Sequence, residues 1–279
     1  MMPGPVIAII IAAAAVFLAA AVYLFMIFPG RGGEKRRSFE NRYFAHRGLY
    51  SEDQSVPENS LPAFEAACLK GYGIELDVQL SRDSRVVVFH DDDLERACGI
   101  KSRVDAFDLD ELEKMPLFGT DERIPLFTEV LETVGKRVPL IVELKTGPRK
   151  AELCEKTLSI LREYGGEACV ESFDPLIVSW FRKHAPEMLR GQLSQQAGAF
   201  RYLGINSVLS FVLANLMLNF LARPEFVAYR IGNKNLSLRL NERFGVMKVA
   251  WTANRNSDGK GSDAVIFEHC DPGPRGGNT

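Results

Sequence analysis

The chain has 279 residues, of which 46% are hydrophobic and 25% are charged, a composition ordinary for a globular protein with one sizeable core. Its formal net charge of −2 provides no general attraction to nucleic acid, so any affinity for a phosphorylated substrate must be local. The 5 cysteines are scattered, odd in number and without metal-type spacing, which favours reduced, packed thiols over an exported disulfide framework.

The N-terminus departs from this composition, because residues 6–28 form an uncharged apolar run. The run is long enough to cross roughly 30 Å of hydrocarbon as a helix. A cleaved signal peptide is the alternative, since the alanine-rich middle offers small-residue cleavage sites. However, no Lys or Arg precedes the run, and it exceeds a normal signal core. We therefore predict one transmembrane anchor within residues 1–28 and a location in the cell membrane.

Four basic residues follow the apolar run at once: Arg31, Lys35, Arg36 and Arg37. By the positive-inside rule this flank faces the cytoplasm, which predicts an external N-terminus and a cytoplasmic globular domain. Residues 29–40, rich in glycine and charge, are predicted to be a juxtamembrane linker or a collar at the membrane surface.

The globular part is predicted to begin with a short strand over residues 43–46, which ends near a glycine that permits a sharp exit. Residues 57–60 then lead into an apolar pattern of helical spacing over residues 61–70, with Ser60 as the cap. The alternative for residues 57–59 is a turn without chemistry.

Residues 73–91 alternate between apolar and polar around a short polar turn, the pattern of a β-hairpin. Glu75 and Asp77 are two apart and point to one face of the first arm. A turn centred on residues 83–84 would place Asp77 opposite His90, with Cβ atoms roughly 5 Å apart. Two carboxylates and an imidazole in one small volume indicate a hard-cation site with an acid/base group beside it. The alternative is the solvated face of an ordinary hairpin.

A polar, irregular stretch follows, with a helical patch at residues 109–115, and we predict an insertion over about residues 81–122. Strands and helices then alternate regularly. Together with the strands ending at His46 and bearing Glu75, they make eight parallel candidates, which predicts a TIM (β/α)8 barrel over residues 41–270. An open doubly wound sheet is the alternative, but no Gly-rich phosphate loop follows any strand. The remaining predicted strands are 139–145, 169–173, 189–193, 226–230, 246–252 and 263–268, and the predicted helices are 126–134, 150–164, 174–184 and 235–244.

Three segments depart from a regular barrel. Residues 205–222 are unusually apolar, and we expect one packed outer helix, with a membrane-resting amphipathic helix as the alternative. Residues 255–262 are short and rich in glycine and serine, so the last crossover is expected to lack a helix. Residues 271–279 are rich in proline and glycine and are predicted to be a flexible tail.

Functional residues of a parallel barrel gather at the carboxyl ends of its strands. Glu143 and Lys145 repeat the two-apart pattern of the hairpin, so both face inward if either does. With Glu75 and Asp77, Glu143 makes an oxygen cage suited to Mg²⁺ or Ca²⁺, whereas the usual ligands of zinc are not clustered. Alternatively, Lys145 only pairs with Glu143, and His90 only belongs to a solvated acidic turn.

Seven short motifs occur in a fixed order along the chain. They are Ala45-His46-Arg47-Gly48, Pro57-Glu58-Asn59-Ser60, Glu75-Leu76-Asp77-Val78, Val88-Phe89-His90-Asp91, Glu143-Leu144-Lys145, Ser172-Phe173 and Trp251-Thr252. In order and spacing, from about residue 43 to residue 268, this series resembles the glycerophosphodiester phosphodiesterases.

The resemblance implies a TIM barrel with an insertion after its second strand, and hydrolysis of glycerophosphodiesters to glycerol 3-phosphate and an alcohol. It leaves open whether water or the substrate's glycerol hydroxyl attacks. The membrane anchor motivates a lysophospholipase D-type alternative, and a non-catalytic phosphodiester-binding protein is a third. No nucleic-acid partner is expected. The implied site residues are His46 and His90 as general acid and base, Glu75, Asp77 and Glu143 as ligands of a divalent cation, Mg²⁺ or Ca²⁺, and Arg47, Lys145 and Trp251 as phosphate and substrate contacts.

Overall fold

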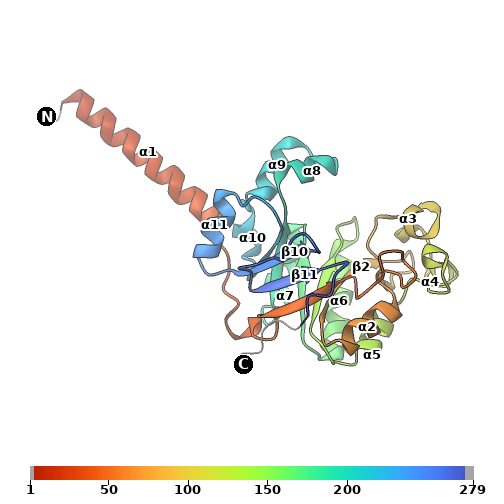
Figure 1. Cartoon of the computed structure of the whole chain (residues 1–279). Coiled ribbons are helices and arrows are strands. Elements are labelled where there is room, and N and C mark those ends of the chain that lie inside the picture. Colours follow the sequence, from red (N-terminus) through yellow and green to blue (C-terminus); the bar gives the residue numbers. More distant parts are fainter. Residues whose placement is uncertain (1–2, 274–279) are drawn as a thin grey trace.

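The computed structural model describes residues 3–273, so residues 274–279 of the predicted tail and the first two of the predicted anchor lie outside it. Eight parallel strands close into a barrel, because β1 pairs with both β2 and β11 (Figure 1). The predicted TIM barrel is confirmed. The barrel strands are β1 (Arg42–His46), β2 (Gly73–Leu80), β6 (Leu140–Leu144), β7 (Ala168–Ser172), β8 (Arg190–Ser194), β9 (Phe226–Arg230), β10 (Met247–Ala253) and β11 (Ala264–Phe267).

The helices that connect these strands cover the outside of the barrel. Ser60 caps α2 as expected, since its side chain accepts a hydrogen bond from the Ala63 amide. No helix joins β10 to β11 in the described chain, in agreement with the short glycine-rich crossover. The crossover helices are α2 (Leu61–Leu69), α5 (Phe127–Val134), α6 (Lys150–Tyr164), α7 (Pro175–His184) and α11 (Leu236–Arg243).

The hairpin forms, but its predicted register was wrong by one residue. The return strand β3 (Val86–Val88) places Val78 opposite Val88, so the residue opposite Asp77 is Phe89, whose amide donates to the Asp77 carbonyl at 3.0 Å. A shift of one residue sends side chains to the other face of a strand. His90 therefore does not lie across the ladder from Asp77, and it follows the end of β3.

The turn explains this shift. The Ser81 amide donates to the Arg85 carbonyl at 2.9 Å, which leaves a three-residue loop of Arg82, Asp83 and Ser84. Ser84 has φ +64°, the left-handed conformation that ends a three-residue hairpin loop. The prediction assumed a symmetric turn with an even number of residues, which would have required the other register.

After β3 the insertion folds as a small layer on one side of the barrel (Figure 1). It has its own apolar cluster, which includes Leu94, Val104, Leu112 and Ile124. The predicted helical patch is shorter than expected. The insertion contains β4 (Asp93–Leu94), α3 (Glu95–Cys98), β5 (Ile100–Arg103), η2 (Val104–Ala106), α4 (Leu109–Leu112) and η3 (Leu117–Gly119).

Aromatic and aliphatic side chains fill the amino-terminal half of the barrel interior. Phe44 and Phe226 are fully buried there, and both depend on a glycine in the neighbouring strand. A Cβ atom on Gly191 would lie 2.0 Å from the Phe226 ring, and one on Gly73 would lie 2.4 Å from the Phe44 ring. These two glycines leave the space that the rings occupy.

At the N-terminus, α1 (Gly4–Ile27) is the one described helix that is long and apolar enough to cross a membrane, a test that N-terminal signal sequences also pass. Its last turn is attached to the barrel, because the Arg223 guanidinium donates to the carbonyls of Phe25 and Phe28. The segment after it contains η1 (Gly33–Arg36) and buries Phe39 against the amino end of the barrel.

The apolar stretch 205–222 does not form one packed outer helix. It divides into α9 (Ser207–Ala214) and α10 (Asn219–Ala222), after a preceding α8 (Ala197–Tyr202). The chain turns between α9 and α10 at Leu216, which has φ +54°. Helix α10 packs against α7, whereas α9 projects from the barrel (Figure 1).

Candidate active site

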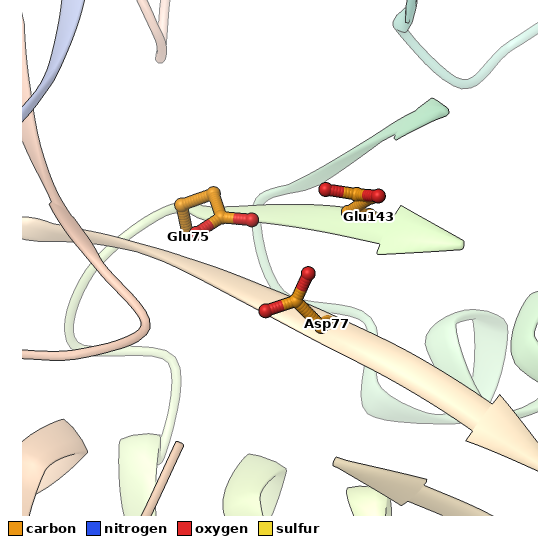
Figure 2. Close-up of side chains that lie close together, drawn as sticks. All are labelled: Glu75, Asp77 and Glu143. Atoms are coloured by element: carbon orange, nitrogen blue, oxygen red, sulfur yellow. The ribbon is translucent and has the colours of Figure 1, made fainter. Parts of the chain in front are cut away.

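Three carboxylates from neighbouring strands converge at the carboxyl end of the barrel. Glu75 and Asp77 lie two apart on β2, and Glu143 on β6 is in register with Asp77. One oxygen from each lies within 4.8 Å of the other two. Figure 2 shows the three carboxylates directed toward one another from the two strands. The predicted oxygen cluster is therefore present as a geometric unit.

Burial and mutual repulsion make this cluster costly on its own. Burial raises the pKa of Glu75 well above its ordinary value, and the neighbouring carboxylates, Asp77 most strongly, add to the shift. Burial also raises the pKa of Asp77, but positive charge, chiefly that of Lys145, outweighs it and keeps the carboxyl ionised. The Lys145 ammonium donates to Asp77 at 3.1 Å and to Glu143 at 2.9 Å.

The donor set fits a hard divalent cation. Mg²⁺ and Ca²⁺ take carboxylate oxygens at roughly 2.0–2.6 Å, so opposite ligands of one ion lie about 4–5 Å apart. A fourth inward carboxylate, that of Glu171 on β7, is buried nearby, and its Oε2 has no hydrogen-bond partner. Lys145 and Arg47 supply positive charge to this group, and a divalent ion would further favour the ionised form of the carboxylates whose pKa burial raises.

His46 ends β1 beside the carboxylate cluster. Its Nδ1 lies 2.8 Å from Oε2 of Glu268, at the end of β11, and its Nε2 lies 3.9 Å from Oε2 of Glu75. Burial lowers the pKa of the His46 imidazole, and nearby Arg47 lowers it further, against the opposing effect of Glu268. In the neutral ring, which burial favours, the contact with Glu268 places the proton on Nδ1 and leaves Nε2 as the basic atom.

His90 has the same kind of support from a different carboxylate. Its Nδ1 lies 2.6 Å from Oδ1 of Asp91, and Arg96 of the insertion donates to both oxygens of that carboxylate. Burial raises the pKa of Asp91, but hydrogen bonds from His90 and Arg96 outweigh burial and hold it below its ordinary value. Nδ1 of each imidazole thus lies within hydrogen-bond distance of an ionised carboxylate.

Arg47 connects the end of β1 to the cluster. Its φ of +54° is a strained left-handed conformation, and in it the Arg47 amide donates to Glu75 at 3.2 Å. Its guanidinium donates to Glu58 at 2.7 Å, and its Nε lies 3.8 Å from Asp77. The adjacent Gly48 has φ +82°, and a Cβ atom there would lie 2.9 Å from Ala63, so a glycine is needed for this sharp exit.

Residues 57–60 are more than a turn. Asn59 donates its side-chain amide to Asp77 at 3.0 Å and its backbone amide to the Arg47 carbonyl at 2.8 Å. Glu58 receives hydrogen bonds from both Arg47 and Arg96. The motif was recognised in the sequence, but no role was predicted for Glu58 or Asn59. No pattern in the sequence indicated a role for Arg96, because only the folded insertion brings it to the site.

Three further polar or aromatic residues near the carboxyl ends of the strands differ in position. Trp251 lies half-buried at the end of β10, donates to the Ala228 carbonyl at 3.1 Å, and meets Phe173 edge to face. Gln192 donates to backbone carbonyls, including that of Ser172, and so ties β7 to β8. Glu171 faces the carboxylate cluster, and burial raises its pKa well above the ordinary value.

The carboxyl ends of the barrel strands bring together two imidazoles that contact carboxylates, a carboxylate cluster and two cations. These groups suit an enzyme that uses acid/base catalysis on an anionic substrate. A model of the glycerophosphoryl diester phosphodiesterase family matches residues 46–269. The chain belongs to this family and is a phosphodiesterase.

Curated relatives and solved structures agree with this family. A glycerophosphodiester phosphodiesterase of Caldanaerobacter subterraneus is 36% identical over 162 residues, which span 54% of this chain and 65% of that protein, just under two thirds of its length. The putative glycerophosphodiester phosphodiesterase YhdW of Bacillus subtilis is 34% identical over 242 residues, 81% of this chain and 94% of that one.

Among solved structures, an Oleispira antarctica phosphodiesterase in complex with the product sn-glycerol-3-phosphate superposes with a TM-score of 0.65. It is 23% identical, and the match covers 81% of this chain and 92% of that one. At this identity the likeness supports the fold.

Proposed function

We propose that the enzyme hydrolyses glycerophosphodiesters to glycerol 3-phosphate and an alcohol, with His46 and His90 as the general acid/base pair. The observation that carries this proposal is the pair of carboxylate-supported imidazoles beside one carboxylate cluster. Two such imidazoles supply a base and an acid near neutral pH, where the unperturbed pKa of histidine is about 6.5.

In this mechanism Glu75, Asp77 and Glu143 would hold a divalent cation, Mg²⁺ or Ca²⁺, which would neutralise charge on the phosphodiester. Lys145 and Arg47 bind the phosphate oxygens, since both present buried positive charge beside the cluster. Trp251 contacts the substrate at the rim. One imidazole accepts the proton of the attacking hydroxyl, and the other, as imidazolium, donates a proton to the leaving alkoxide as the P–O bond breaks.

The test measures glycerol 3-phosphate released from glycerophosphocholine by the full-length protein. His46→Ala and His90→Ala are each expected to lower kcat/KM by about 10²–10⁴. His184→Ala is the matched control, because the His184 imidazole is exposed on α7 and contacts Trp180 of the same helix. Full activity in both site variants would contradict the acid/base assignment.

Metal dependence is tested separately. We expect EDTA to abolish the release of glycerol 3-phosphate and either Mg²⁺ or Ca²⁺ to restore it. Activity that persists after exhaustive chelation would contradict the proposed role of Glu75, Asp77 and Glu143.

A lysophospholipase D-type activity is the second candidate, favoured by an apolar cavity at the rim. The cavity, about 380 Å³, starts at Thr146, next to Lys145, and continues between the start of α7 and α9. Its apolar lining, which includes Phe173, Leu209 and Leu213, suits an acyl chain. Filling it by Leu213→Trp should reduce cleavage of lysophosphatidylcholine several-fold more than cleavage of glycerophosphocholine. An equal effect on both substrates would remove this candidate.

We also propose that α1 is a single-pass anchor, residues 29–40 its juxtamembrane connection, and residues 41–270 the catalytic unit on the cytoplasmic side. The support is the apolar, exposed surface of α1 and the basic residues after it. A reporter fused after Thr279 that is active only in the cytoplasm would agree, and one active only outside would reverse the orientation.

A further inference from the structure

Exposed apolar side chains outside α1 concentrate on one short part of the surface. Tyr202 at the end of α8 is 93% exposed, and on α9 Val208 is 75% and Phe211 56% exposed. Leu203 and Leu209 belong to the same stretch. A contiguous exposed apolar patch on a folded protein marks a surface that another apolar partner covers.

The exposed face of helix α9 is apolar, which is unusual for a helix that faces water. Its buried residues are the small Ser210 and Ala214, whereas the large apolar Val208 and Phe211 are exposed. The Asn206 side chain caps it by accepting from the Leu209 amide at 2.9 Å. The cap and the backbone hydrogen bonds therefore stabilise the helix, although Val208 and Phe211 are exposed.

A short hydrogen-bond chain places the end of α9 beside α1. The Tyr23 hydroxyl lies 2.7 Å from Oγ of Ser237, and the Ser237 hydroxyl donates to the Asn215 side chain at 3.2 Å. Tyr23 lies in the last two turns of α1, and Asn215 directly follows α9. Tyrosine is typical of the membrane–water interface, so α9 ends at the level where α1 would leave the hydrocarbon.

The end of α1 is also held firmly to the α10 region. Asn219 donates its side-chain amide to the Ile27 carbonyl at 3.1 Å, and Arg223 lies over the Phe25 ring at 4.8 Å. An arginine that stacks on an aromatic ring at the end of an apolar helix is typical of the headgroup region. In Figure 1, α9 and α10 lie on the part of the barrel from which α1 departs.

We propose that α9 is an interfacial helix whose Val208 and Phe211 face inserts into the headgroup boundary of the lipid bilayer, beside α1. This inference rests on the proposed role of α1 as an anchor. The bilayer is the occupant that the contacts favour, because hydrogen bonds through Ser237 and Asn215 join the end of α9 to Tyr23 of α1. Attachment at two places, α1 and α9, would restrict the tilt of the barrel on the membrane.

Docking of α9 also bears on substrate access. Leu209 and Leu213 of α9 line the apolar cavity that reaches Thr146 at the site rim. With Val208 and Phe211 in the bilayer, one face of α9 would contact the membrane, and Leu209 and Leu213 would line the cavity. A substrate with an acyl chain would then reach the site without crossing water.

The test uses tryptophan fluorescence of the full-length protein in vesicles of phosphatidylcholine and phosphatidylglycerol, with or without brominated acyl chains. Phe211→Trp adds a reporter on α9, and the signal of the native Trp180 and Trp251 is subtracted with the wild-type protein. Brominated lipid should quench the added emission by about half, because an interfacial helix lies about 5–10 Å into the headgroup–acyl boundary. Leu69→Trp, at an exposed position on α2, is the matched control and should be unaffected.

Phe17→Trp in the middle of α1 separates the two proposals. Quenching at residue 17 without quenching at residue 211 would overturn the docking of α9 and leave the anchor intact. No quenching at residue 17 would contradict the anchor, whatever the result for α9. An emission at residue 211 that is blue-shifted but insensitive to brominated lipid would indicate a protein partner, such as a second copy, and would also overturn the proposal.

Discussion

The two ends of the barrel interior are built from the same strands, yet they have opposite chemistry. On β1, Phe44 faces the apolar amino end and His46 the site; on β6, Ile141 and Glu143 differ in the same way. Two residues along a strand correspond to about 6.6 Å. Along one strand, two residues therefore separate the side chains that pack in the barrel core from those of the proposed catalytic site.

The apolar packing at the amino end offsets the unfavourable free energy of the buried carboxylates at the carboxyl end. Inward carboxylates at the carboxyl end repel one another, as the raised pKa of Glu75 indicates. Burial of Phe44 and Phe226 at the amino end stabilises the same strands without polar groups. Changes at the two ends should therefore separate stability from activity.

The largest expected effect is on stability, from Phe226→Ala at the amino end. Removing a fully buried ring that packs over Gly191 should lower the free energy of unfolding by about 3–5 kcal/mol. Denaturant unfolding measures this, and kcat/KM of the folded fraction should stay within a few-fold of wild type. Phe211→Ala, at an exposed position, is the control for loss of a ring. A large loss of kcat/KM in folded Phe226→Ala would mean that the two ends are coupled.

Glu75→Gln should instead lower activity without lowering stability. Because burial and neighbouring carboxylates raise the pKa of Glu75, a neutral amide relieves repulsion, and the melting temperature in EDTA should not fall. Activity with Mg²⁺ or Ca²⁺ should fall by about 10²–10³, since one of the three proposed anionic ligands of the cation is lost. Thermal unfolding and kcat/KM on glycerophosphocholine measure the two effects. A melting temperature several degrees lower would show that the Glu75 carboxylate stabilises the metal-free fold.

Glu268→Gln should give the smallest change, a shift of the pH profile with roughly a tenfold loss of rate. The Glu268 carboxylate stabilises protonated His46, so its removal lowers the pKa of that imidazole further. If His46 is the base, the neutral ring then persists to lower pH, and the acid limb of kcat/KM moves to lower pH. A limb that moves to higher pH would contradict the assignment of His46 as the base.

Local patterns were sufficient for the elements and for part of the site. The helix over residues 150–164 and the strand over residues 226–230 have the predicted bounds, since their periodicity and flanking residues are strong. The convergence of Glu75, Asp77 and Glu143 also follows from two-residue spacing on neighbouring parallel strands. Local patterns did not suffice for the hairpin, because a three-residue loop changes which residues are opposed.

By itself, the sequence determined the barrel, its eight strands, the N-terminal apolar helix and the residues that resemble a phosphodiesterase site, because these depend on periodicity and short spacing. Only the tertiary structure decided that Arg96 reaches Glu58, that Asn59 holds Asp77, and that α9 ends beside Tyr23. These contacts join residues far apart or on unrelated elements. Their geometry is set by the closure of the barrel and the packing of the insertion, which no local pattern encodes.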